Sequence, residues 1–216
     1  TQSRPALAGP VEPLQEVINR YIPGPTADLP IRIYRPTSSD NAPAIIYFHG
    51  GGWVLNFLDI YDASLTRLAN QSGATIISVN YQKAPEHPFP IPFDDCYATL
   101  LWVIENARNL NIDPATIGVA GDSAGANLAS AVAIKARDNQ IPLAFQLLIY
   151  PCNDRDFTTD SYLNCATGYG LSTQAMQWFW DQYLQGDHHD DNPYAVPMKA
   201  KTFKDIAPAI IITAQY

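Results

Sequence analysis

The sequence predicts an α/β protein with a mostly parallel sheet and helices on both of its faces. Short runs rich in β-branched residues alternate with longer helix-like segments, which is typical of such a sheet. Most of the short runs are also continuously apolar, as expected for strands that are covered on both faces. The strand candidates are residues 31–35, 44–48, 75–80, 116–121, 145–150 and 209–213.

The helix candidates lie between these runs, at about 60–72, 92–108, 124–138 and 173–185. Two stretches interrupt the alternation. Residues 1–30 are rich in proline, and residues 151–200 insert the aromatic-rich "STQAMQWFWDQYL" between two strands. The aromatic side chains of this insertion suit either core packing or a cap helix that lines an apolar substrate pocket. The sequence leaves both interpretations open.

Composition excludes several classes of function. The chain has 216 residues, enough for one domain with a core, and a net charge of −8 without a Lys/Arg cluster, which argues against a nucleic-acid partner. No stretch of eighteen consecutive apolar residues occurs, so we expect no membrane span. Three cysteines without CxxC spacing favour a reducing compartment, and no secretory leader pattern opens the sequence; we therefore expect a cytoplasmic protein.

One short stretch carries most of the chemistry. In "GVAGDSAGANLA" the pattern G-x-S-x-G spans Gly121 to Gly125, directly after a strand candidate and directly before a helix candidate. On a sharp strand-to-helix turn, glycines two residues either side of the serine relieve crowding. We interpret Ser123 as a nucleophile and the backbone N–H of Ala124 as an oxyanion donor. The alternative is a serine that merely caps the helix.

A glycine-rich loop follows an upstream strand candidate, in "YFHGGGWV". Consecutive glycines let successive backbone N–H groups converge on one point, so Gly51 and Gly52 are candidates for the remaining oxyanion donors. We expect Gly50 and His49 to support this loop. A phosphate-binding loop is a weaker interpretation, because no Lys-Ser/Thr pair follows the glycines. Together the two motifs indicate acyl transfer by a serine nucleophile.

These residues resemble a known family, the hormone-sensitive-lipase-like (HGGG-type) esterases of the α/β-hydrolase fold. The matching stretches are His49–Trp53 and residues 81–90, 121–129, 147–151 and 208–216. The resemblance implies a single domain over 1–216, with cap elements from about 1–30 and 155–200. It also implies a carboxylic ester hydrolase that acts on short to medium acyl esters through an acyl-enzyme, without metal or organic cofactor. It assigns Ser123 as nucleophile and Gly51, Gly52 and Ala124 as oxyanion donors, with Glu86 and His87 as scaffold.

The acid and the base of the triad are not found at the positions that the resemblance implies. The Asp is due one position after Tyr216, and the His further on. We therefore expect the sequence to be incomplete at both ends, and these 216 residues alone to hydrolyse esters poorly. His188 and His189 are less favoured substitutes for the base. With Asp187, Asp190 and Asp191 they also suggest a metal site, although such a loop is more often merely solvated.

Two alternatives to an esterase remain open. The same fold serves receptor-like proteins that bind a ligand and have lost the catalytic His, although the intact glycine loop and serine turn disfavour such a binder. Within the hydrolases, a long-chain lipase or an amidase is not distinguished by the sequence. A homodimer is also left open.

Overall fold

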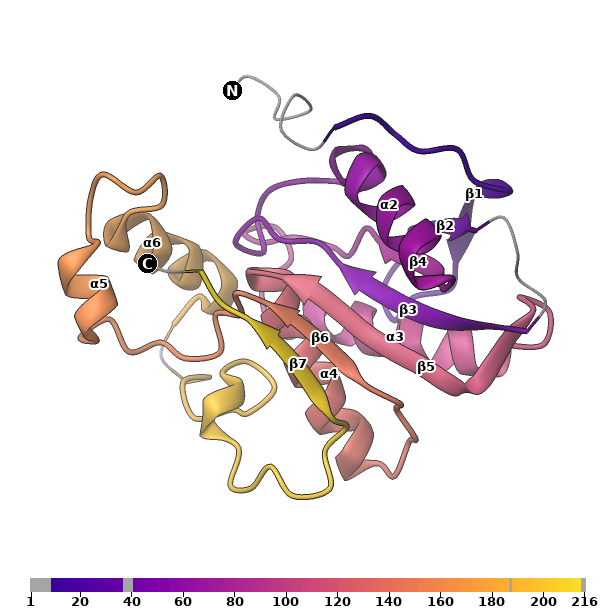
Figure 1. Ribbon diagram of the computed structural model, residues 1–216. Helices are drawn as coiled ribbons and strands as arrows, with labels where there is room; N and C mark the ends of the chain where they lie inside the picture. Colours follow the sequence, from indigo (N-terminus) through magenta and orange to yellow (C-terminus); the bar gives the residue numbers. More distant parts are fainter. Residues whose placement is uncertain (1–8, 37–40, 187, 215–216) are drawn as a thin grey trace.

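In the computed structural model, which describes residues 9–36, 41–186 and 188–214, seven strands form one sheet in the order β1-β2-β4-β3-β5-β6-β7 (Figure 1). The strands are β1 (Glu16–Ile22), β2 (Leu29–Arg35), β3 (Ala42–Phe48), β4 (Thr75–Val79), β5 (Ile112–Asp122), β6 (Gln146–Ile149) and β7 (Ala209–Ile212). β2 runs antiparallel to β1 and β4, and the other neighbours are parallel. The predicted α/β class and its mostly parallel sheet are confirmed.

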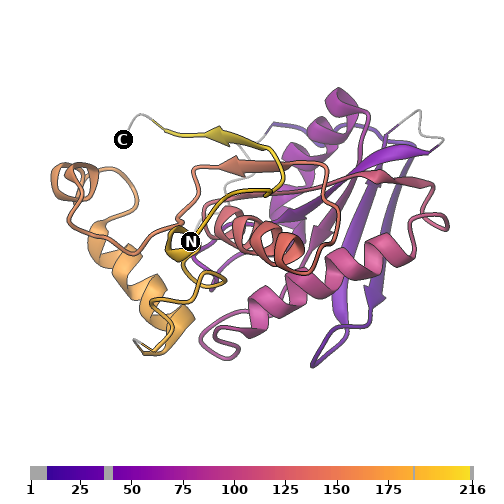
Figure 2. The ribbon, with the colours of Figure 1, turned by 90° about the horizontal axis from the view of Figure 1, so that it is seen from below.

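Helices cover both faces of this sheet, as predicted. α2 (Asp62–Ser72) lies on one face, and α3 (Ile91–Glu105) and α4 (Ala124–Asp138) lie on the other (Figures 1 and 2). α4 is buried at nearly every position, because its many alanines allow it to pack closely between the sheet and α3. The insertion contributes α5 (Asp160–Asn164) and α6 (Thr173–Leu184), and the short helices η1 (Leu58–Tyr61) and η2 (Pro197–Lys199) complete the described elements.

The N-terminal segment differs from the expectation. Residues 1–30 were expected to form part of a cap, but Glu16–Ile22 form β1, which pairs with β2 at the edge of the sheet. The sequence search missed this strand because most of its side chains are exposed or half-exposed and it lacks a continuous apolar run. Residues 1–8 lie outside the described residues, so a cap role for that part stays a prediction.

The order of the strands places two loops side by side. From β3 the chain passes through α2 to β4 on one side, and then through α3 to β5 on the other side of β3. In the β3–β5 pair, Phe48 lies opposite Gly121. Parallel α/β sheets bind ligands at the carboxyl ends of strands where the order reverses in this way. The residues that follow Phe48 and Gly121 therefore lie at the edge of the sheet where a site is expected.

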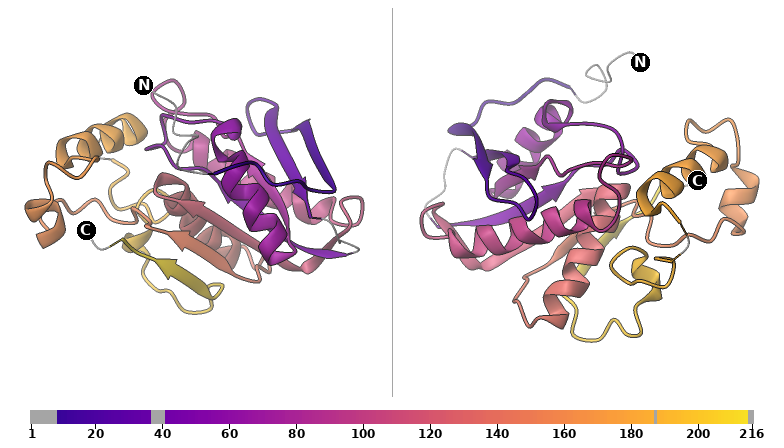
Figure 3. Two further views of the ribbon diagram at one scale, coloured as in Figure 1. Left: turned by 45° about the horizontal axis from the view of Figure 1, so that its top comes forward. Right: turned by 180° about the vertical axis from the view of Figure 1, so that it is seen from behind.

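α5 and α6 lie beyond that same edge of the sheet (Figure 3). The buried side of α6 fits the core-packing interpretation of its aromatic sequence, and a cap role that lines a substrate pocket stays a prediction. Its residues Met176, Trp180, Tyr183 and Leu184 are buried, and the Tyr183 ring stacks on Trp53 with centroids 4.4 Å apart. Trp178, by contrast, is 49% exposed. Within the described part of the chain, no helix has the length and apolar character needed to cross a membrane.

Candidate active site

Ser123 occupies the turn between β5 and α4 in a conformation that few residues adopt. Its backbone has φ 54° and ψ −120°, a sparsely populated combination that persists only where the surrounding structure enforces it. The N–H of Ser123 donates to the carbonyl of Ile149 in β6, at 2.9 Å. The Ser123 side chain makes no capping hydrogen bond to α4. This backbone geometry is the one expected of a nucleophile elbow, and the hydrogen bond that a capping serine would make to α4 is not made.

The two glycines of the pattern are required by a neighbouring strand. A Cβ on Gly125 would lie 1.9 Å from the carbonyl oxygen of Phe48, at the end of β3. A Cβ on Gly121 would lie 2.4 Å from the carbonyl carbon of Gly125 and 2.6 Å from the same Phe48 oxygen. The crowding predicted from the sequence is therefore present, and the obstacle is the backbone of β3 and of the turn itself.

The glycine loop begins where β3 ends and turns sharply at Gly51 and Gly52. Their φ angles are 124° and 59°, both in the region that favours glycine. The Gly51 carbonyl accepts hydrogen bonds from the N–H groups of Val54 and Leu55, at 3.1 and 2.8 Å. A Cβ on Gly52 would meet the ring of Phe179 from α6 at 2.3 Å. The cap helix thus packs directly against one of the candidate oxyanion donors.

His49 is held as part of the scaffold of this loop. The side chain is fully buried, and its ring stacks on Tyr81 with centroids 4.5 Å apart. Its Nδ1 lies 2.9 Å from the carbonyl oxygen of Gly50, which can only accept, so Nδ1 carries the proton. Burial lowers the pKa of His49 to about 4. A neutral imidazole so fixed suits the supporting role predicted for it.

One further side chain joins the loop to the serine turn. Asp122 is the last residue of β5, and its Oδ1 accepts from the Gly50 N–H and from the Tyr47 hydroxyl, each at 2.9 Å. Its Oδ2 accepts from the Tyr61 hydroxyl at 3.0 Å. Burial raises the pKa of the Asp122 carboxyl, against these hydrogen bonds, which lower it. A role for Asp122 was not predicted from the sequence. The signal available was an acidic residue at the end of a continuously apolar strand.

A cysteine lies beside the candidate nucleophile. The Cys152 thiol lies just after β6, near the hydroxyl of Ser123, which lowers the pKa of the thiol slightly. Burial raises the pKa of Cys152 to about 12, so the thiol stays neutral at ordinary pH. A neutral thiol is a poor base and a poor nucleophile. Cys152 is therefore not suited to act as the general base for Ser123.

Residues 81–90 make hydrogen bonds to the glycine loop and to α6, and a scaffold role for Glu86 and His87 stays a prediction. The Tyr81 hydroxyl donates to the carbonyl of His49 at 2.7 Å, and the Ala84 N–H donates to the carbonyl of Trp53 at 3.0 Å. At the other end of this segment, the Phe89 N–H donates to the carbonyl of Tyr183 in α6 at 2.7 Å. The segment thus connects the glycine loop to the cap helix.

The two adjacent histidines lie in another environment. The rings of His188 and His189 are 4.0 Å apart, and His189 packs edge-on against Phe89 at 4.8 Å. Asp187, the first acidic neighbour in the suggested metal site, falls outside the described residues. Among the residues that the structure does describe, no three His, Cys, Asp or Glu side chains are grouped to hold a metal ion.

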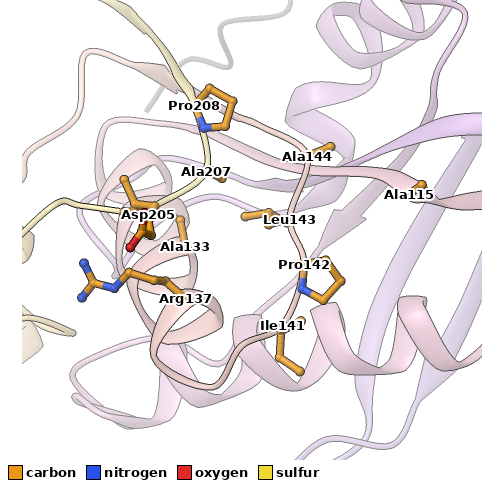
Figure 4. A pocket seen from close by; sticks show the side chains of 11 residues that line it. Ala115, Ala133, Arg137, Ile141, Pro142, Leu143, Ala144, Asp205, Ala207 and Pro208 are labelled. Carbon is orange, nitrogen blue, oxygen red and sulfur yellow. The ribbon is translucent and has the colours of Figure 1, made fainter.

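A cavity of about 370 Å³ lies near the amino-terminal ends of β6 and β7, away from the Ser123 turn (Figure 4). Its lining comes from the last turns of α4, the loop before β6 and the loop before β7, and includes Arg137, Pro142 and Asp205. Arg137 donates to the carbonyl of Thr202 and to Asp138. This cavity is separate from the serine turn, which follows the carboxyl end of β5.

Comparison with known proteins decides the family. A family model described as "alpha/beta hydrolase fold" matches residues 45–216. The chain belongs to the α/β-hydrolase-fold family. The expected resemblance to carboxylesterases of this fold is confirmed by its relatives. The carboxylesterase NlhH of Mycobacterium tuberculosis is 39% identical over 194 residues, which are 88% of this chain and 61% of that protein. An arylesterase of Saccharolobus solfataricus is 34% identical, over 98% of this chain and 69% of that protein.

Solved structures of other α/β hydrolases agree. An esterase of Pyrobaculum calidifontis superimposes with a TM-score of 0.90 at 39% identity, over 95% of this chain and 68% of that chain. The first curated relative, NlhH, is matched over about three fifths of its length. The part that is shared includes the serine turn and the glycine loop, since the family match begins at residue 45.

Proposed function

We propose that this α/β hydrolase is a serine carboxylic ester hydrolase that acts on short to medium acyl esters. The observation that carries the proposal is that the Ser123 turn lies beside the start of the glycine loop. The two are held together by the pairing of Phe48 with Gly121 and by the close packing of Gly125 on the Phe48 carbonyl. Relatives support the reaction class: a Pseudomonas putida protein 34% identical to this chain is named ethyl acetate hydrolase.

In the proposed mechanism Ser123 Oγ attacks the ester carbonyl carbon, and its proton passes to a general base. The backbone N–H groups of Gly51, Gly52 and Ala124 hold the negative oxygen of the tetrahedral intermediate. The alcohol leaves after taking up the proton, and water then hydrolyses the acyl-enzyme. The N-terminus of α4 points at the reacting centre and favours the developing negative charge. We propose that the acid and the base are an Asp and a His beyond Tyr216.

The test is hydrolysis of p-nitrophenyl acetate, butyrate and octanoate by the protein expressed from the complete reading frame. Replacing Ser123 by Ala should lower kcat by at least about 10⁴-fold, since nucleophile and base act as a unit. The matched control is Ser72→Ala, an exposed serine whose hydroxyl bonds only within the end of α2. Full activity in Ser123→Ala would contradict the assignment. No hydrolysis with Ser123 intact would favour a ligand-binding protein.

A cytoplasmic location is part of the same proposal. All three cysteines are free thiols in the structure, which is in keeping with a reducing compartment. Self-association is measured separately, by size-exclusion chromatography with light scattering.

A further inference from the structure

Asp122 receives hydrogen bonds from two segments that are distant in the sequence. The Tyr47 hydroxyl and the Gly50 N–H come from the end of β3 and the start of the glycine loop, and the Tyr61 hydroxyl comes from η1. A carboxylate only accepts hydrogen bonds, and it accepts on both oxygens. These three donors therefore fit an ionised Asp122, because a protonated carboxyl would carry a hydrogen that competes with one of them.

The contact between Asp122 and Gly50 is also steric. A Cβ on Gly50 would lie 2.4 Å from Asp122 Oδ2 and 2.9 Å from the Asp122 carbonyl oxygen. The backbone of the glycine loop consequently rests against the side chain that precedes Ser123 in the chain. The position of Gly50 is fixed by this contact and by the Asn56 side chain, which donates to the Gly50 carbonyl at 3.0 Å.

The charge of Asp122 is balanced by dipoles. Of the ion pairs found in the described parts of the chain, none includes Asp122. A buried carboxylate without a cation costs free energy unless hydrogen bonds compensate it. An apolar residue would fill this position at lower cost if packing were its only purpose. The cost suggests a role in geometry that only an acceptor on both oxygens fulfils.

We propose that Asp122 is a positioning residue, which sets the orientation of the oxyanion loop relative to Ser123. The hydrogen bond from the Gly50 N–H to Asp122 fixes the backbone at Gly50. This in turn fixes the directions of the next two N–H groups, those of Gly51 and Gly52. Because Asp122 is covalently attached to Ser123, the same residue sets the distance between the nucleophile and the oxyanion donors. This role rests on the proposed ester hydrolysis for its catalytic consequence, but the anchoring of the loop does not depend on it.

The test replaces Asp122 by Asn, which keeps the shape but offers only one acceptor oxygen. Hydrogen–deuterium exchange of a peptide that contains residues 50–53 reports the anchoring without any turnover. We expect exchange there at least tenfold faster, and kcat for p-nitrophenyl acetate about 10- to 100-fold lower with KM changed less than threefold. The matched control is Asp62→Asn, which removes a carboxylate that accepts from the Tyr34 hydroxyl and from Arg32 instead.

Tyr47→Phe is the second variant, in case Asp122→Asn does not fold. It keeps Asp122 and removes one of its hydrogen-bond donors. We therefore expect faster exchange at residues 50–53 and a lower kcat, both by smaller factors than in Asp122→Asn. Unchanged exchange at residues 50–53 in a folded Asp122→Asn or Tyr47→Phe protein would overturn the proposal. Faster exchange with unchanged kcat would overturn it as well, since the loop would then be anchored without consequence for the reaction. If the unaltered protein hydrolyses no ester, the proposed function fails and exchange alone decides the anchoring.

Discussion

At the scale of single residues, the site depends on the carbonyl oxygen of Phe48, which occupies the space that side chains at positions 121 and 125 would need. The Phe48 carbonyl lies within 2.6 Å of the position that a Cβ would take on Gly121 and within 1.9 Å on Gly125. Neither obstacle is the end of a flexible side chain that can move aside. The serine turn and the last residue of β3 therefore hold each other in place.

Gly125→Ala should accordingly lower the unfolding free energy by about 3 kcal/mol or more, the upper range for forced overpacking. Chemical denaturation monitored by circular dichroism measures this change. Gly73→Ala is the control, because Gly73 has φ 67° but nothing within 4 Å of an added Cβ. Its cost should be only the left-handed strain of about 1 kcal/mol. Equal losses in the two variants would show that the Phe48 contact is not what requires Gly125.

The sequence predicted Ser123 and its glycines because their pattern reports a local backbone requirement. It did not predict Asp122, Tyr47 or Tyr61 as part of the site. These side chains meet only after β3 and β5 have paired and η1 has folded back. A tyrosine inside an apolar strand looks the same in sequence whether its hydroxyl reaches a carboxylate or not. The site assignments of the individual residues remain predictions for the experiments described here.

At the scale of elements, the cap helix α6 has two different sides. Trp180 and Tyr183 pack on Trp53, while Phe179 covers Gly52. The sequence left core and cap interpretations open because both use the same aromatic residues at helical spacing. The packing shows the core contacts of this helix, and its cap role stays a prediction. β1 was missed for the complementary reason, since an edge strand with exposed side chains carries no strong pattern.

The contact between Phe179 and Gly52 predicts a coupling between the two positions. Gly52→Ala brings a Cβ to 2.3 Å from the Phe179 ring, in addition to strain at φ 59°. Truncation of Phe179 to Ala removes the obstacle but not the strain. We therefore expect the double variant to be about 1–2 kcal/mol more stable than the sum of the single changes. Thermal unfolding of the four proteins measures this coupling.

Gly51→Ala combined with Phe179→Ala provides the control cycle. A Cβ on Gly51 would meet the carbonyl of Leu55 at 2.5 Å, and its three nearest atoms belong to Leu55 and Asn56 rather than to Phe179. The two losses should therefore add. The same coupling in both cycles would mean that α6 contacts the loop less specifically than this structure indicates.

At the scale of the whole molecule, the two loops of the site meet because the chain crosses from β3 to β4 on one side and then back from β4 to β5 on the other side of β3. The sequence predicted six of the seven described strands and the long helices between them, but it contains no local signal for which strands are neighbours. In the folded sheet β3 and β5 pair in a register that sets Phe48 opposite Gly121, while α2 and α3 lie on opposite faces. The resemblance to a known family, not the residue pattern, is what made this arrangement foreseeable.

Global stability should also respond to pH through the buried His49. Its pKa is lowered to about 4 in the folded state from an ordinary value of 6.5, so the unfolded state binds a proton first as pH falls. The stabilisation is present above pH 6.5 and is lost between pH 6.5 and 4. The loss approaches about 1.4 kcal/mol per pH unit, on the order of 3 kcal/mol in all.

Denaturant unfolding at pH 7.0, 6.0, 5.0 and 4.5 measures this loss, and His49→Asn supplies the comparison. Carboxylates titrate in the same range in both proteins, so the informative quantity is the difference between the two pH profiles. A parallel course of the two profiles would contradict the assignment of this pH dependence to His49.

The outer strand β7 has a practical consequence for measurements made on the 216 residues alone. Ile210, Ile211 and Ile212 are 62%, 59% and 48% exposed in the structure. A strand of β-branched residues with unpaired backbone groups is a template for pairing with another chain. Solutions of the 216 residues alone are therefore best kept dilute and free of sulfate. Enzyme assays at nanomolar concentration avoid this problem, whereas spectroscopic samples at high concentration benefit from mild additives that compete for apolar surface.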